Sequence, residues 1–112
     1  MKQYVIDELR IEDYEKVKAY LDMNFGSPDM GNIYWIPLDE EILSHVQKGH
    51  EECRPFYFAA ELDSERMRVV CELLIRTKNR IRCSCIAYAD ENQRNWLFRR
   101  IDDMLETLGI SI

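Results

Sequence analysis

The sequence contains few glycines and prolines and none of the common phosphate-binding or catalytic motifs. Only 4 of its 112 residues are glycine and 3 are proline. A loop that cradles phosphate with its backbone needs clustered glycines, yet neither G-x-G-x-x-G nor G-x-x-x-x-G-K-[ST] occurs. The nucleophile motif G-x-S-x-G and the zinc-protease motif H-E-x-x-H are also absent. Nothing in the sequence therefore indicates catalysis, and we expect a non-enzymatic protein without a cofactor.

Long apolar runs are missing as well. No stretch approaches the roughly 18 apolar residues that a membrane span requires. The first residues, Met1–Glu8, reach acidic side chains before an apolar signal-peptide segment could form. Leu, Ile, Val and Phe nevertheless total 30 residues, which is too many for a disordered chain. We expect one cytoplasmic domain over residues 1–112 that makes no membrane contact.

Basic residues are outnumbered, and the excess of negative charge is unevenly distributed. The net charge is -6. Residues 1–52 hold 12 acidic and 5 basic side chains, whereas residues 53–100 hold 6 acidic and 10 basic ones. Proteins that bind nucleic acid need clustered cationic side chains to neutralise phosphates, so the acidic total argues against a nucleic-acid partner. Any anionic partner should meet the basic second half.

The apolar spacing predicts an α+β domain. We expect a two-layer sandwich in which a mainly antiparallel sheet carries helices on one face, in the order β-α-β-α-β-β-β-α. The predicted strands are 3–9, 33–36, 56–62, 67–76 and 81–89, and the predicted helices are 11–25, 40–48 and a last helix between Asp90 and Gly109. Asp90 and Gln93 have the spacing of a capping box, which marks a helix start.

The predicted three-stranded meander is apolar on both faces. In one strand Val70 and Leu74 lie opposite the main apolar set, and in the next Ile86 and Tyr88 do so. A sheet with one solvated face should show polar residues at these positions. Either part of a helix or another protein chain should therefore cover this face, and we predict that a second copy of the chain does so in a homodimer.

Four cysteines and two histidines raise the question of a metal site. His50, Cys53, Cys83 and Cys85 together form an acceptable ligand set for zinc. Their spacing matches no ordinary zinc pattern, because the chain has no Cys-x2-Cys pair. Cysteine is also one of the most frequently buried residue types. We therefore predict core roles and no metal, and keep these four residues as the candidates for a metal site.

A cluster of basic residues surrounds the turn between the last two predicted strands. Its members are Arg76, Lys78, Arg80 and Arg82. Arginine offers a planar fork that suits carboxylate or phosphate, so the turn is a candidate site for an acidic protein partner. Trp96 lies off the main apolar stripe of the last helix and is a candidate interface residue. The alternative is that these cations form a solvated edge or pair with the acidic half.

The segments Glu72–Ala89 and Tyr34–Leu38 resemble a small family of uncharacterised bacterial proteins. The resemblance covers most of the chain and implies no known activity. The predicted architecture is also similar to acidic, secretion-chaperone-like domains. The function we expect is a dimeric, non-enzymatic protein-interaction module of the adaptor or chaperone type. The alternative is a small metal- or ligand-binding domain that uses the Cys and His residues.

Overall fold

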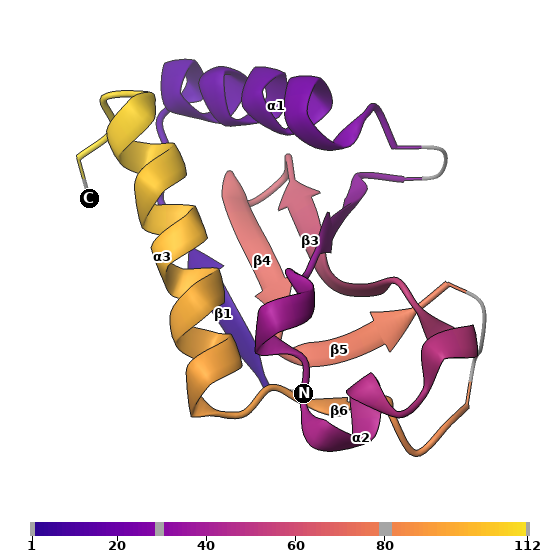
Figure 1. The fold of residues 1–112 in the computed structure, drawn as a ribbon. Coiled ribbons are helices and arrows are strands. Elements are labelled where there is room, and N and C mark those ends of the chain that lie inside the picture. Colours follow the sequence, from indigo (N-terminus) through magenta and orange to yellow (C-terminus); the bar gives the residue numbers. More distant parts are fainter. Residues whose placement is uncertain (1, 29–30, 79–81, 112) are drawn as a thin grey trace.

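The computed structural model describes residues 2–28, 31–78 and 82–111 and confirms the α+β class (Figure 1). Eleven elements follow one another in the described residues: β1 (Gln3–Ile6), α1 (Ile11–Phe25), β2 (Ile33–Pro37), η1 (Glu40–Ile42), α2 (His45–Lys48), η2 (Glu51–Cys53), β3 (Phe56–Asp63), β4 (Arg68–Glu72), β5 (Leu74–Thr77), β6 (Ala87–Tyr88) and α3 (Glu91–Thr107), where η denotes a 3₁₀ helix. The order agrees with the predicted alternation apart from the two 3₁₀ helices and one additional strand before α3.

All strand pairs of the sheet are antiparallel. Along one edge of β3 lies β2, and along its other edge lie β4 and β5, which follow each other in the chain. The outer partners are β1, which pairs with β4, and β6, which pairs with β5. The strand predicted over 67–76 is thus two strands, separated at Leu73, whose N–H donates to Lys2 and whose carbonyl accepts from Ala89.

The helices α1 and α3 pack on one face of this sheet and bury the main core. The inward-facing residues Tyr34, Phe58 and Leu62 are at most 2% exposed. The Tyr34 hydroxyl donates a hydrogen bond of 2.6 Å to Asp22 of α1, and Phe58 stacks on Trp96 of α3. Alternate residues of the same strands, Trp35 and Tyr57, lie on the opposite face and are partly exposed.

The helix predicted over 40–48 is divided into η1 and α2. Ser44 interrupts it, because the Ser44 hydroxyl caps Gln47 and the Gln47 side chain accepts from the Ser44 N–H. Asp39, the expected N-cap, makes no capping hydrogen bond and instead accepts from the indole N–H of Trp96. The buried residue of α2 is Gln47, at 2% exposure, whereas Val46 is 47% exposed.

The prediction of a strand over residues 81–89 is wrong for most of that range. Ile81 lies outside the described residues, residues 82–86 form turns and loop, and only Ala87–Tyr88 is strand. The carbonyl of Cys85 explains part of this difference, since it accepts a hydrogen bond from the side chain of Gln47 instead of pairing in the sheet. The capping box at Asp90 and Gln93 is confirmed at the start of α3.

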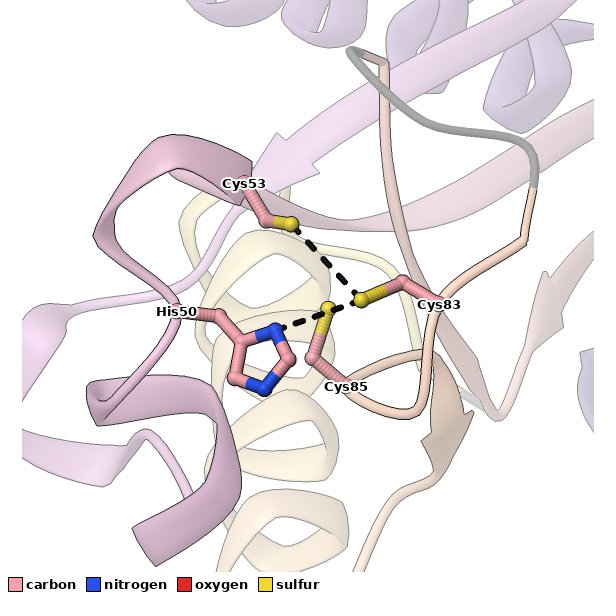
Figure 2. Close-up of side chains that lie close together, drawn as sticks. All are labelled: His50, Cys53, Cys83 and Cys85. Carbon is pink, nitrogen blue, oxygen red and sulfur yellow. Dashed lines mark hydrogen bonds between the residues drawn. The ribbon is translucent and has the colours of Figure 1, made fainter.

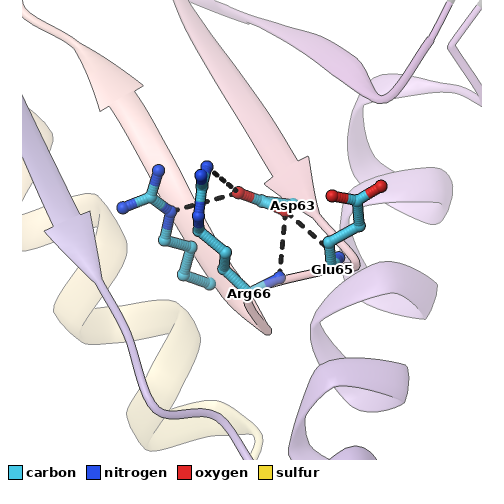
Figure 3. Close-up of polar contacts among 4 residues, drawn as sticks. Asp63, Glu65 and Arg66 are labelled. Carbon is cyan, nitrogen blue, oxygen red and sulfur yellow. Dashed lines mark hydrogen bonds and ion pairs between the residues drawn. The ribbon is translucent and has the colours of Figure 1, made fainter.

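The turn between β3 and β4 is organised by Asp63 (Figure 3). One carboxylate oxygen accepts from the backbone N–H groups of Glu65 and Arg66, each at 3.1 Å. The other oxygen forms ion pairs with Arg68 at 3.2 Å and with Arg66 at 3.6 Å. These contacts lower the pKa of Asp63 below its ordinary value. The hydrogen bond from the backbone N–H of Arg66 makes the largest contribution, and the contact with Arg68 adds to it.

In the part of the chain that the structure describes, no helix has both the length and the apolar character needed to cross a membrane.

Candidate metal centre

Two segments that lie 30 residues apart in the sequence meet at one end of the sheet (Figure 2). His50 lies between α2 and η2, and Cys53 ends η2. Cys83 and Cys85 lie in the connection between β5 and β6. Their side chains, which the sequence left as alternative metal candidates, converge on one point: one ligand atom from each of the four residues lies within 4.8 Å of the others.

One distance in this cluster equals the separation of two sulfurs around a tetrahedral zinc ion, and a second is slightly shorter than such a site requires. The sulfur atoms of Cys53 and Cys83 are 3.8 Å apart, and the Cys83 sulfur lies 3.2 Å from Nδ1 of His50. Zinc–ligand bonds of 2.0–2.3 Å in a tetrahedron separate two sulfurs by about 3.8 Å and a sulfur from a nitrogen by about 3.6 Å. The distance between the sulfurs of Cys53 and Cys83 therefore already has the required length. The distance from the Cys83 sulfur to Nδ1 of His50 would have to increase by a few tenths of an ångström.

A short turn positions the first two ligands. The N–H of Cys53 donates to the carbonyl of His50 at 3.0 Å, which closes η2 and places both side chains on the same side of the turn. The hydroxyl of Thr77, at the end of β5, donates to the carbonyl of Cys53. The backbone that carries Cys53 is thus tied to the sheet.

A buried pair of glutamines positions the segment that carries Cys85. Nε2 of Gln47 donates to the Cys85 carbonyl at 3.2 Å. Oε1 of Gln47 in turn accepts from Nε2 of Gln93 at 2.9 Å. Both glutamines are 2% exposed, so their polar groups depend on these partners. Gln47 was not predicted from the sequence to have a structural role. The spacing of Ser44 and Gln47 is the same capping-box pattern as that of Asp90 and Gln93, and it could have indicated a helix start at Ser44.

The surroundings of the three sulfurs shift their thiol pKa values in opposite directions. The backbone N–H of Cys85 makes the largest contribution, and with the Cys85, Cys53 and His50 side chains it lowers the pKa of Cys83 to about 6. Burial raises the pKa of Cys85 to about 12 and also raises the pKa of Cys53. Cys83 is therefore the most readily deprotonated of the three, and the thiol of Cys53 donates a hydrogen bond to its sulfur. A thiolate is the form of cysteine that binds metals.

The donor set limits the kind of metal that fits. Three thiol sulfurs and one imidazole nitrogen form the Cys₃His set typical of structural zinc, in which the protein supplies all four ligands. Soft sulfur ligands disfavour Mg²⁺ and Ca²⁺, which prefer oxygen. The fourth cysteine, Cys71, is not part of this cluster: it lies in β4, opposite Tyr4 of β1, and burial raises its pKa to about 12.

Of the basic residues predicted to bind an acidic partner, Lys78 lies on the face of the sheet opposite to Trp96. Arg76 forms an ion pair with Glu72 at 2.9 Å. Lys78 lies over the rings of Trp35 and Tyr57 on the outer face of the sheet, whereas Trp96 stacks on Phe58 on the helical face. Arg82 is exposed, and Arg80 lies outside the described residues. An acidic partner for this region stays a prediction.

Comparisons of the chain with protein-family models, with curated proteins and with solved structures gave no match. The resemblance to a family of uncharacterised bacterial proteins therefore stays a prediction.

Proposed function

We propose that the protein is a small zinc-binding domain in which His50, Cys53, Cys83 and Cys85 hold one structural Zn²⁺ ion. The observation that carries this proposal is the convergence of four ligand atoms within 4.8 Å from two distant segments. Core packing alone explains the burial of Cys53 and Cys85, but it does not require that their sulfur atoms face a third sulfur and an imidazole.

The ion would stabilise the part of the sheet formed by the short strand pair β5–β6. The strand pair β5–β6 has only two residue pairs, Leu74–Tyr88 and Ile75–Ala87, and the segment before β6 is irregular. Zinc would join this segment to η2, which follows α2. Structural zinc commonly supplies folding free energy to small domains of this kind.

We propose a cytoplasmic location as a consequence of the zinc site. The site needs Cys53, Cys83 and Cys85 as thiolates, and reducing compartments keep cysteines from pairing in disulfides.

Metal content tests the zinc site directly. We expect protein purified without chelators to contain about one zinc per chain by elemental analysis. Replacement of zinc by Co²⁺ should produce the intense visible absorption of a tetrahedral site with thiolate ligands. The variants Cys83→Ser and Cys85→Ser should lose most of the bound metal.

Cys71→Ala is the matched control, because it removes a buried cysteine outside the cluster. It should retain a full complement of zinc. Wild-type protein that folds without zinc and takes up neither Zn²⁺ nor Co²⁺ would contradict the proposal. Equal loss of metal from the Cys71 and Cys83 variants would contradict the assignment of the ligands.

A homodimer through the outer sheet face is a second candidate. Tyr88 is 43% exposed on this face, and its pairing partner Leu74 is partly exposed. Exposed apolar side chains on a sheet face favour a protein interface. Light scattering should give twice the chain mass for the wild type and one chain mass for Tyr88→Asp. A monomeric wild type at tens of micromolar would contradict the dimer.

A further inference from the structure

A cavity of about 630 Å³ lies on the molecule away from the metal centre, and the zinc proposal does not involve it. It is bounded by the end of α1, by β2 and by the start of β3, and Lys78 is part of its wall. Pockets that hold small ligands have volumes of about 300–1,000 Å³. The space is therefore large enough for a small organic molecule.

The wall of the cavity that belongs to the sheet is aromatic. Trp35 of β2 and Tyr57 of β3 are arranged edge to face, with ring centroids 5.9 Å apart and an interplanar angle of 75°. Pro37 and Pro55 adjoin them and add apolar surface without backbone N–H donors. Flat rings pack well on such a surface because aromatic pairs prefer offset or edge-to-face contacts.

Among the described residues that line this cavity, Lys78 is the only one with an ammonium, guanidinium or carboxylate group. Its Nζ lies 4.9 Å from the centroid of Tyr57 and 5.6 Å from that of Trp35. None of the ion pairs between described residues involves Lys78. An ammonium held over two rings thus retains hydrogen-bonding capacity for an anion.

We propose that this cavity binds a small molecule in which an aromatic ring is joined to an anionic group. The ring would pack on Trp35 and Tyr57, and the anion would meet the ammonium of Lys78. Lys78 would repel a cationic ligand, and none of the described lining residues offers a carboxylate that could offset this repulsion.

Four commercial probes separate the contribution of the ring from that of the charge. 3-Phenylpropionate and phenyl phosphate carry a ring and an anion, 3-phenylpropylamine carries the same ring and a cation, and propionate carries the anion alone. Binding is followed by saturation-transfer NMR and by the emission of Trp35 in a Trp96→Phe background. We expect 3-phenylpropionate and phenyl phosphate to bind, and the amine and propionate not to bind. Whichever of the two anions binds more tightly shows whether the cavity prefers a carboxylate or a phosphate group.

Two charge variants test the role of Lys78. Lys78→Gln should weaken anion binding about tenfold, the usual effect of losing one charge-assisted contact. Lys78→Glu should bind the amine in preference to the anions. Lys16→Gln, which removes an exposed ammonium of α1, is the matched control and should bind like the wild type.

The proposal is overturned if no ring-bearing anion binds at millimolar concentration, if the amine binds the wild type as well as the anions do, or if Lys78→Gln changes nothing. Retention of zinc by the variants shows that a loss of binding does not come from the metal centre. Failure of the zinc proposal leaves this test unaffected, because none of the four metal candidates lines the cavity.

Discussion

Gln93 of α3 donates a hydrogen bond of 2.9 Å from Nε2 to Oε1 of Gln47 in α2. Each glutamine is also the third helical residue of its own capping box, so each accepts from the N–H of its N-cap residue, Asp90 or Ser44. The two helix starts are therefore joined through their caps. Because Gln47 donates to the carbonyl of Cys85, the same contact connects α3 to the candidate metal centre.

The variant Gln93→Ala should lower the free energy of unfolding by about 1–3 kcal/mol, the usual cost of leaving buried polar partners unsatisfied. It removes the donor to Gln47 and to the carbonyl of Ile42. Urea denaturation measures the change. Asn92→Ala, at the exposed neighbouring position, should alter the free energy by less than about 0.5 kcal/mol. Equal effects of the two substitutions would show that the buried network contributes nothing.

The variant Thr77→Val should weaken zinc binding about tenfold, because groups that orient metal ligands commonly have effects of this size. Its hydroxyl donates to the carbonyl of Cys53, and valine keeps the shape without the donor. Competition with a zinc chelator measures the affinity. Thr107→Val, at the exposed end of α3, is the control and should bind zinc like the wild type. An unchanged affinity in Thr77→Val would contradict a role of this contact in positioning Cys53.

Removal of zinc by a chelator should lower the melting temperature by several degrees, since about 1 kcal/mol corresponds to roughly 4–8 °C in a small domain. The loss of stability should be confined to the segments that carry the four ligands. Amide hydrogen exchange should accelerate in residues 50–54 and 82–88, while β1 and β4 remain protected. Uniform acceleration over the sheet, or none at the two ligand segments, would contradict a zinc ion that holds these segments together.

The variant Asp63→Asn should lower the melting temperature at pH 7, and the difference from the wild type should shrink as the pH falls below about 4. The folded pKa of Asp63 is lowered, so its stabilising effect is present above the unfolded pKa and is lost on acidification through the folded value. Thermal unfolding from pH 3 to 7 measures this. Glu65→Gln is the control, because only the backbone N–H of Glu65 contacts Asp63 (Figure 3). A difference that does not depend on pH would contradict a contribution from the charge.

Local signals predicted much of the fold. The Asp90–Gln93 spacing located the start of α3, and Gly26, in a left-handed conformation with φ of 79°, ends α1 as expected. Alternation over residues 67–76 predicted a common apolar face for Val69 and Cys71, and both are buried, although Val70 on the opposite face is also only 5% exposed. These features depend on neighbours in sequence or on the two-residue period of a strand, which is why the sequence alone was sufficient.

The candidate metal centre was only partly predictable. The residue types at positions 50, 53, 83 and 85 identified a possible ligand set, but the expectation that Cys83 and Cys85 lie on a strand was wrong. Their segment is irregular because its backbone bonds to the side chain of Gln47, a contact across 38 residues. A partner so distant in sequence leaves no periodic pattern around the cysteines themselves.

The sequence by itself determined the class of the fold, the ends of the long helices and the residue types available for chemistry. Only the tertiary structure decided which of them meet. It brought four ligand atoms within 4.8 Å of one another, and it placed Lys78 over Trp35 and Tyr57 but Trp96 on the other face of the sheet. The physical reason is that short-range hydrogen bonds and side-chain periodicity act within elements, whereas both sites depend on contacts between elements that only packing of the whole chain creates.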